Sequence, residues 1–297
     1  MTGREKEVKE SRIQELLVKR EEYVNSGEIE KEIGVLRELR MLFKRVYGVE
    51  SEENVKVLTE LGNALKYVGK FEESVRLLSM AEKIVLKKYG ENTMIFVTCN
   101  ANLAEVYRVM KKYEKVEEKY FKAIKTYKRN NFKNGYVFAG ICNNLGLFFE
   151  ETGRYEDSLK WQEKSLEILE NLENSKIQGA IIRSNMVNSY LKIDEKKLAE
   201  NSMSTALEIL QNEVGESSNL YFNILNNLAN VYFENKSYKK SVVLLKRCEE
   251  LCSDIFGIKN EIYKNILEKI VIAKKNIEKN KMEQYVWKNK IVKKLKN

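Results

Sequence analysis

The sequence predicts an all-α fold, a solenoid of about seven helix-turn-helix repeats with a C-terminal capping helix. Two properties of the composition favour helices. The chain of 297 residues contains no proline and only 14 glycines, so the commonest helix breakers are scarce. Hydrophobic residues make up 43% and charged residues 33%, which suits a folded chain with a core. The third observation is a pattern of small residues that recurs about every 42 residues.

The period is clearest in the first helix of each repeat, where a large apolar residue precedes a small one. The small residues are spaced by 42, 42, 41, 42 and 42 residues, at Gly62, Ala104, Gly146, Val187, Ala229 and Val271. Five of them are followed three positions later by a large residue, namely Leu65, Tyr107, Phe149, Tyr190 or Tyr232. This pattern predicts a helix face on which the small residue lets a partner helix approach closely.

A turn and a second helix complete each repeat. The turn is predicted by Gly69-Lys70-Phe71 and by its counterparts Lys111-Lys112-Tyr113, Gly153-Arg154-Tyr155 and Lys236-Ser237-Tyr238. The second helix has apolar or small residues at helical spacing, such as Leu78, Ala81 and Val85. It often ends at a glycine, which caps a helix in the left-handed conformation, as expected for Gly48, Gly90, Gly215 and Gly257.

In chain order, these signals predict a polar extension, a solenoid and a cap. The extension covers residues 1–10 and the solenoid covers 11–275. The repeats lie near 11–48, 52–90, 94–134, 136–177, 178–215, 219–257 and 260–279. The last repeat keeps a helix but loses the pattern, and residues 280–297 are expected to form a basic capping helix.

The positive charge of the chain is concentrated at its C-terminal end. The formal net charge is +9, and the segment from Lys264 onward, with eleven lysines and three glutamates, carries +8 of it. Attraction to phosphate or anionic lipid is therefore expected only of the last helices. The beginning of the sequence lacks the apolar stretch of a signal peptide, and no run is long enough to span a membrane, which predicts a cytoplasmic protein.

The repeat resembles the tetratricopeptide repeat over roughly residues 11–275. The resemblance rests on the large–small–aromatic first helix, the turn, and a small residue in the second helix, at Ala81, Ala123, Ser165, Ala206 and Cys248. The 42-residue period and segments such as Asn143-Asn144-Leu145-Gly146 are similar to the kinesin-light-chain subtype. The resemblance implies a right-handed solenoid whose concave groove binds another polypeptide.

Asparagines recur on the side of the first helix that faces away from its core residues. Counting each small residue as position eight, position six lies about 145° from the core direction. Four successive repeats have asparagine there, at Asn102, Asn144, Asn185 and Asn227. Position nine adds Asn63, Asn188 and Asn230, and position five adds Asn143 and Asn226.

These asparagines predict a peptide-binding ladder. Asparagine is a poor residue inside a helix, whereas its amide matches the N–H and C=O groups of an extended peptide. Arg108 is a further candidate contact, and Tyr67, Glu150, Glu151 and Phe233 are candidates for recognising ligand side chains. The alternative is that the asparagines join neighbouring helices to each other or to water, because almost a tenth of the chain is asparagine.

Catalysis and metal binding are not expected. The chain has no histidine, which removes the commonest general base. Cys99, Cys142, Cys248 and Cys252 are predicted to be reduced core thiols, although Cys248 and Cys252 are spaced as two metal ligands on one helix would be. The sequence predicts no cofactor.

The leading functional prediction is a non-enzymatic adaptor that captures a peptide or partner segment in the groove. One alternative is a regulatory subunit or a receptor like the bacterial peptide-pheromone receptors. Another is a binder of nucleic acid or an acidic surface through the basic tail, where Tyr285, Trp287, Ile291 and Leu295 alternate with lysines. The same tail is also expected to act as a cap whose apolar side covers the last repeat.

Overall fold

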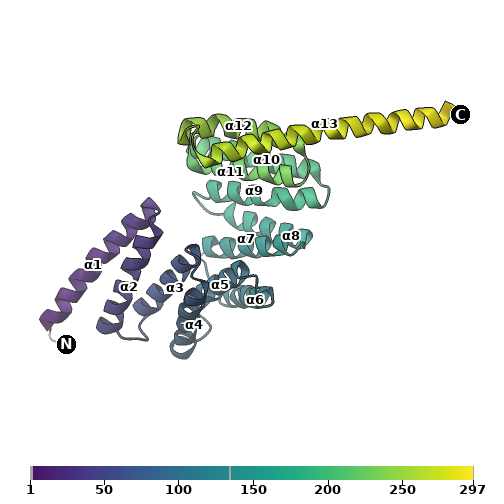
Figure 1. The fold of residues 1–297 in the computed structure, drawn as a ribbon. Helices are drawn as coiled ribbons and strands as arrows, with labels where there is room; N and C mark the ends of the chain where they lie inside the picture. The colour runs from purple at the N-terminus through teal and green to yellow at the C-terminus, as the bar shows by residue number, and fades with distance from the viewer. Residues whose placement is uncertain (1–2, 134, 297) are drawn as a thin grey trace. The chain divides into compact units, whose positions relative to one another are not determined.

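The computed structural model describes residues 3–133 and 135–296, and every regular element in these two ranges is an α-helix. Figure 1 shows the thirteen helices of this part of the chain. They are α1 (Gly3–Ser26), α2 (Ile29–Val46), α3 (Glu52–Tyr67), α4 (Phe71–Lys88), α5 (Met94–Val109), α6 (Tyr113–Arg129), α7 (Gly135–Glu151), α8 (Tyr155–Leu169), α9 (Lys176–Lys192), α10 (Lys196–Val214), α11 (Asn219–Glu234), α12 (Tyr238–Phe256) and α13 (Glu261–Lys296). The predicted all-α repeat fold is confirmed.

The chain forms two compact units, Met1–Phe148 and Phe149–Asn297, and the division falls within α7. In the first unit each helix from α1 to α6 packs on the next one along the chain. In the second unit the helices from α8 to α13 do the same. The first helices of successive repeats also touch, α3 with α5 and α9 with α11, so their side chains share one face within each unit.

The turn between the two helices of a repeat needs one residue in the left-handed conformation. Six such residues have φ between 57° and 77°, and they are Gly27, Gly69, Lys111, Gly153, Asp194 and Lys236. The turn is closed by a backbone hydrogen bond, for example from the Lys70 N–H to the Leu65 carbonyl at 3.0 Å. Where the residue is not glycine, this conformation costs about 1–2 kcal/mol.

The small residue of the first helix lets the second helix pack closely, as the sequence predicts. Gly62 of α3 lies against Leu78 of α4, and a Cβ added at Gly62 would lie 2.7 Å from Leu78 Cγ. The Ser74 hydroxyl of α4 donates to the Gly62 carbonyl at 2.5 Å. The same bond recurs in the second unit, where Ser241 of α12 donates to the Ala229 carbonyl at 2.9 Å. A buried serine therefore supports this helix pair in both units.

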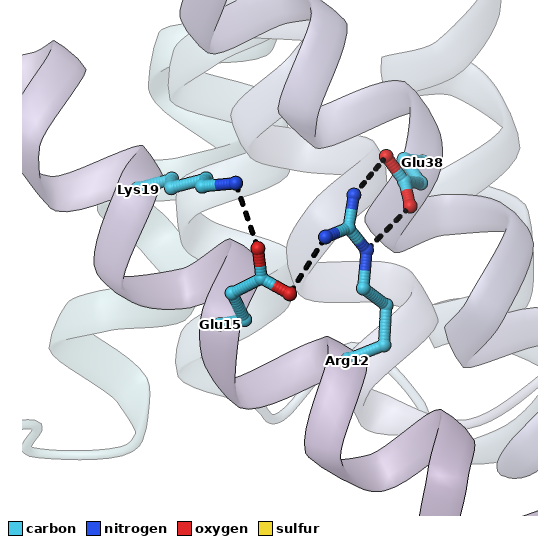
Figure 2. Close-up of polar contacts among 4 residues, drawn as sticks. All are labelled: Arg12, Glu15, Lys19 and Glu38. Carbon is cyan, nitrogen blue, oxygen red and sulfur yellow. Dashed lines mark hydrogen bonds and ion pairs between the residues drawn. The ribbon is translucent and has the colours of Figure 1, made fainter.

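The first helix begins at Gly3, so it includes residues 3–10 of the predicted polar extension. Ile13 and Leu16 are buried and form the inner face of α1. Figure 2 shows how Arg12 joins α1 to α2 by donating from Nε and Nη2 to the two carboxylate oxygens of Glu38, at 2.9 and 3.2 Å.

Glu15 extends this charged cluster along α1. It accepts hydrogen bonds from Arg12 at 2.6 Å and from Lys19 at 2.7 Å, as Figure 2 also shows. The hydrogen bonds to Glu38 and Glu15 raise the pKa of Arg12, and those from Lys19 and Arg12 lower the pKa of Glu15. The cluster is solvent-exposed, so it orients α1 on α2 and adds little stability.

The last helix, α13, runs without a break from Glu261 to Lys296. Ile266, Ile270 and Ala273 in the first half of α13 are buried, and α13 packs on α12. The second half extends past α12 (Figure 1), and Tyr285 and Trp287 are 65% and 64% exposed. The side chains of Ile291 and Leu295 lie outside the described residues.

Candidate functional site

The four position-six asparagines lie on α5, α7, α9 and α11. Asn102, Asn144 and Asn185 are half-buried, and Asn227 is exposed. The side-chain amides of Asn102 and Asn227 make no hydrogen bond within the described ranges. Asn144 accepts only a long bond, of 3.4 Å, from its neighbour Asn143. Asn102 in the first unit and Asn227 in the second therefore present donors and acceptors that can bind a ligand.

The position-nine asparagines of the second unit have a different role. Asn188 of α9 donates to Glu150 Oε1 at 2.9 Å and accepts from Asn235 Nδ2 at 2.8 Å. Lys269 of α13 donates to Asn230 Oδ1 of α11 at 2.7 Å. These bonds tie the first helices of successive repeats together, as the alternative interpretation expected. Asn63 and Asn226 are half-buried, and neither makes a side-chain hydrogen bond in the described part of the chain.

Glu150 is the centre of a partly buried polar network in the second unit. Its Oε2 accepts from the Ser189 hydroxyl at 3.2 Å, and that hydroxyl lies 3.2 Å from the Ser158 hydroxyl. Ser158 also contacts Gln162 Oε1 at 3.4 Å. Burial raises the pKa of Glu150, and the bonds from Asn188 and Ser189 oppose that rise. The sequence pointed to Glu150 but not to Ser158, Gln162 or Ser189, because nothing in a lone serine or glutamine indicates burial.

Arg108, the other predicted contact, is held by its own helix. Its Nε and Nη2 donate to the two carboxylate oxygens of Glu105 at 3.2 and 3.1 Å. The hydroxyl of Tyr120, from α6, also donates to Glu105. Glu105 is only 8% exposed, so the guanidinium and the phenol supply the hydrogen bonds that a buried carboxylate needs. The charge of Arg108 is therefore already paired with a carboxylate of its own helix.

The residues proposed for side-chain recognition lie at the ends of the first helices. Tyr67 is 65% exposed at the end of α3. Phe233 packs edge-on against Tyr238, with ring centroids 5.6 Å apart. Glu151, the last residue of α7, is exposed. Tyr67 is therefore the most accessible apolar surface among these candidates.

A small cavity lies between α3 and α5, beside the asparagine face of the first unit. Its volume is about 220 Å³, and it is lined by Lys56, Thr59, Glu60, Met94, Ile95 and Thr98. Thr98 is four residues before Asn102, which places it one helical turn away on the same face. The cavity is large enough for one side chain of a ligand.

The four cysteines are buried and form no disulfide. Burial raises the pKa of Cys99 to about 11 and that of Cys248 to about 12, so both are held as thiols. In the ranges that the structure describes, no group of three acidic, cysteine or histidine side chains is placed to hold a metal ion. No helix among those residues is long and apolar enough to cross a membrane.

Comparison with known proteins agrees with the repeat geometry. Residues 139–212 match the tetratricopeptide repeat family. No curated protein sequence matches the chain. BtubC (BKLC) from P. vanneervenii is 19% identical, with a TM-score of 0.59 over 68% of this chain and 81% of that one.

Two further solved structures share the fold. One consists of the nearly identical TPR-like repeats of a protein described as a kinesin light chain of Podosopora anserina. It is 13% identical, with a TM-score of 0.57 over 68% of this chain and 96% of that one. The other is the Rap conjugation gene regulator of the plasmid pLS20 in complex with the Phr* peptide. It is 14% identical, with a TM-score of 0.58 over 88% of this chain and 73% of that one.

Proposed function

We propose that the chain, which matches the tetratricopeptide repeat over residues 139–212, binds an extended segment of another polypeptide along the first helices of its repeats. In this proposal the position-six asparagines hold the backbone of the ligand. The chain acts as a non-enzymatic interaction module, and its partners are proteins or peptides.

The observation that carries the proposal is a difference between two pairs of asparagines. Asn188 and Asn230, at position nine, are engaged in bonds between helices. Asn102 and Asn227, at position six, make no such bond within the described part of the chain. An asparagine inside a helix is unfavourable, so amides that stabilise no helix packing are best explained by a ligand.

The expected contribution to the free energy of peptide binding follows from the number of position-six asparagines in each unit. The first unit contains Asn102 and Asn144, and the second contains Asn185 and Asn227. At about 0.5–1.5 kcal/mol net per hydrogen bond, one bond from each asparagine of a pair contributes about 1–3 kcal/mol. Specificity must then come from side-chain pockets such as the one between α3 and α5.

The similarity to the Rap regulator supports a more specific version of this proposal. That protein was solved with a bound peptide and is a gene regulator. By analogy, peptide binding to this chain would change its affinity for a second protein, as a regulatory subunit or peptide receptor requires. This version differs from a simple adaptor in that peptide and second protein must affect each other's binding.

The test begins with selection of peptides from a random display library on the purified full-length chain. The dissociation constants of the selected peptides are then measured for the wild type, for Asn102→Ala with Asn144→Ala, and for Asn185→Ala with Asn227→Ala. The control is Asn201→Ala with Asn212→Ala, two exposed asparagines of the second helix α10.

We expect at least one position-six pair to weaken binding by about 5- to 150-fold, with the control unchanged. If both pairs bind the selected peptides as tightly as the wild type, these asparagines are not the peptide site.

A further inference from the structure

A second surface, independent of the asparagines, lies between the beginning of α12 and the second half of α13. A cavity of about 290 Å³ is found there. Its polar lining includes Lys236, Lys239, Lys240, Asn280, Lys281 and Gln284, which together define the basic cleft. Tyr238 and Ile277 add apolar surface to the same cavity.

Most of the positive charge in the basic cleft is not neutralised. Lys240 forms an ion pair with Glu200 of α10. Lys236, Lys239 and Lys281 are exposed, and none has an acidic partner among the residues that the structure describes. Three uncompensated ammonium groups around one small cavity favour an anionic group inside it.

The first turn of α12 adds to this positive potential. Its first helical hydrogen bond runs from the Ser241 N–H to the Ser237 carbonyl, and the Ser237 side chain does not cap the helix. The N–H groups that precede Ser241 therefore point outward at the beginning of the helix, where the helix dipole places a partial positive charge. The equivalent helices have acidic residues in their first turns: α4 has Glu72 and Glu73, and α8 has Glu156 and Asp157. The first turn of α12 has none.

Aromatic side chains flank the basic cleft on α13. Ile277, Lys281 and Gln284 face the cavity, and helical geometry places Tyr285 and Trp287 on either side of that face. Both rings are more than half exposed. A ligand that fits must therefore bring apolar groups as well as negative charge.

We propose that the basic cleft is a docking site for an acidic segment of a partner polypeptide. Carboxylates of the segment bind the lysines and the first turn of α12, and its apolar side chains pack on Tyr238, Ile277 and the two flanking aromatics. A nucleic acid fits less well because its backbone needs a continuous basic track, whereas the first 263 residues carry a net charge of only +1.

The experiment uses the full-length chain and fluorescence anisotropy with three labelled probes. The first is a short synthetic peptide in which glutamates alternate with leucine and phenylalanine. The second is the same peptide with glutamine in place of glutamate, and the third is a single-stranded oligonucleotide. The test variant is Lys239→Glu with Lys281→Glu. The control is Lys83→Glu with Lys125→Glu, two exposed lysines of α4 and α6 with the same change in charge.

The acidic peptide is expected to bind the wild type and the control equally, and the cleft variant about tenfold more weakly, with an affinity that falls as salt rises. Circular dichroism shows whether the cleft variant is folded, and Lys239→Gln with Lys281→Gln replaces it if it is not. The proposal is overturned if the cleft variant binds the acidic peptide normally or if the glutamine peptide binds as well as the acidic one. It is also overturned if the oligonucleotide binds more tightly than the acidic peptide and loses its affinity in the cleft variant.

Discussion

Asn188 donates a hydrogen bond from its side-chain amide to the carboxylate of Glu150 at 2.9 Å, joining α9 to the last turn of α7 within the second unit. The side-chain oxygen of Asn188 accepts a second hydrogen bond, from Asn235, the residue that follows α11. One asparagine thus links three successive first helices. The bond distinguishes an asparagine that stabilises the fold from those proposed to bind a ligand.

The first prediction concerns that distinction. Asn188→Ala removes both bonds and leaves a partly buried carboxylate with fewer donors, so it is expected to lower the free energy of unfolding by about 1–3 kcal/mol. Asn227→Ala, at position six of α11, removes no bond among the described residues and is expected to change stability by less than about 0.7 kcal/mol. Urea unfolding followed by circular dichroism measures both. Equal stability of the two variants would show that the Asn188 bonds contribute nothing.

The second prediction concerns pH. Burial raises the pKa of Glu150, so the folded chain binds this proton more tightly than the unfolded chain does. The stabilisation from protonated Glu150 is complete below the ordinary glutamate pKa, near 4.3, and is lost as the pH rises through the raised value. Glu150→Gln cannot titrate, so the wild type is expected to lose stability relative to this variant as the pH rises above the ordinary glutamate pKa. A difference in denaturation midpoint that stays constant as the pH rises would contradict the assigned shift.

The third prediction tests the close helix packing at Gly62. Gly62→Ala places a methyl group 2.7 Å from Leu78 Cγ and is expected to destabilise the chain by about 1–3 kcal/mol. Gly34→Ala, also inside a helix but with no atom within 4 Å of the added group, is expected to be stabilising by up to about 1 kcal/mol. Thermal unfolding of the two variants compares them directly, and a stabilising Gly62→Ala would rule out the tight contact.

The position of Gly62 could be predicted from sequence because the 42-residue period places it at the same point of the first helix as Ala104, Gly146 and Ala229. The left-handed residues of the turns were only partly predictable. Glycine signals this conformation and aspartate tolerates it, as at Asp194, but Lys111 and Lys236 adopt it because the repeat requires it, not because their side chains favour it.

The roles of the asparagines were even harder to predict from the sequence, because they depend on residues of neighbouring repeats. Helical periodicity predicts which face Asn188 and Asn230 occupy. It does not show that Glu150 and Lys269, from other helices, reach their amides. The separation of structural from available asparagines therefore required the three-dimensional structure.

The fourth prediction concerns the strained turns. Lys111 has φ of 57°, so Lys111→Gly relieves strain and is expected to be stabilising by about 0.5–1 kcal/mol after the entropy cost of glycine. Gly69→Lys, at the equivalent turn of the preceding repeat, is expected to be destabilising by a similar amount. Urea denaturation of both variants tests this pair. If both substitutions changed the free energy of unfolding in the same direction, strain in the left-handed conformation would not explain the stability of these turns.

The most direct test of the proposed function is nuclear magnetic resonance of the asparagine side-chain amides in selectively labelled protein, with and without a peptide selected by display. Resonances are assigned by single alanine substitutions. The proposal predicts that the peptide shifts the amide signals of the position-six asparagines in at least one unit, Asn102 with Asn144 or Asn185 with Asn227, and leaves those of Asn201 and Asn212 in place. Saturating peptide that shifts none of the four position-six signals would contradict it.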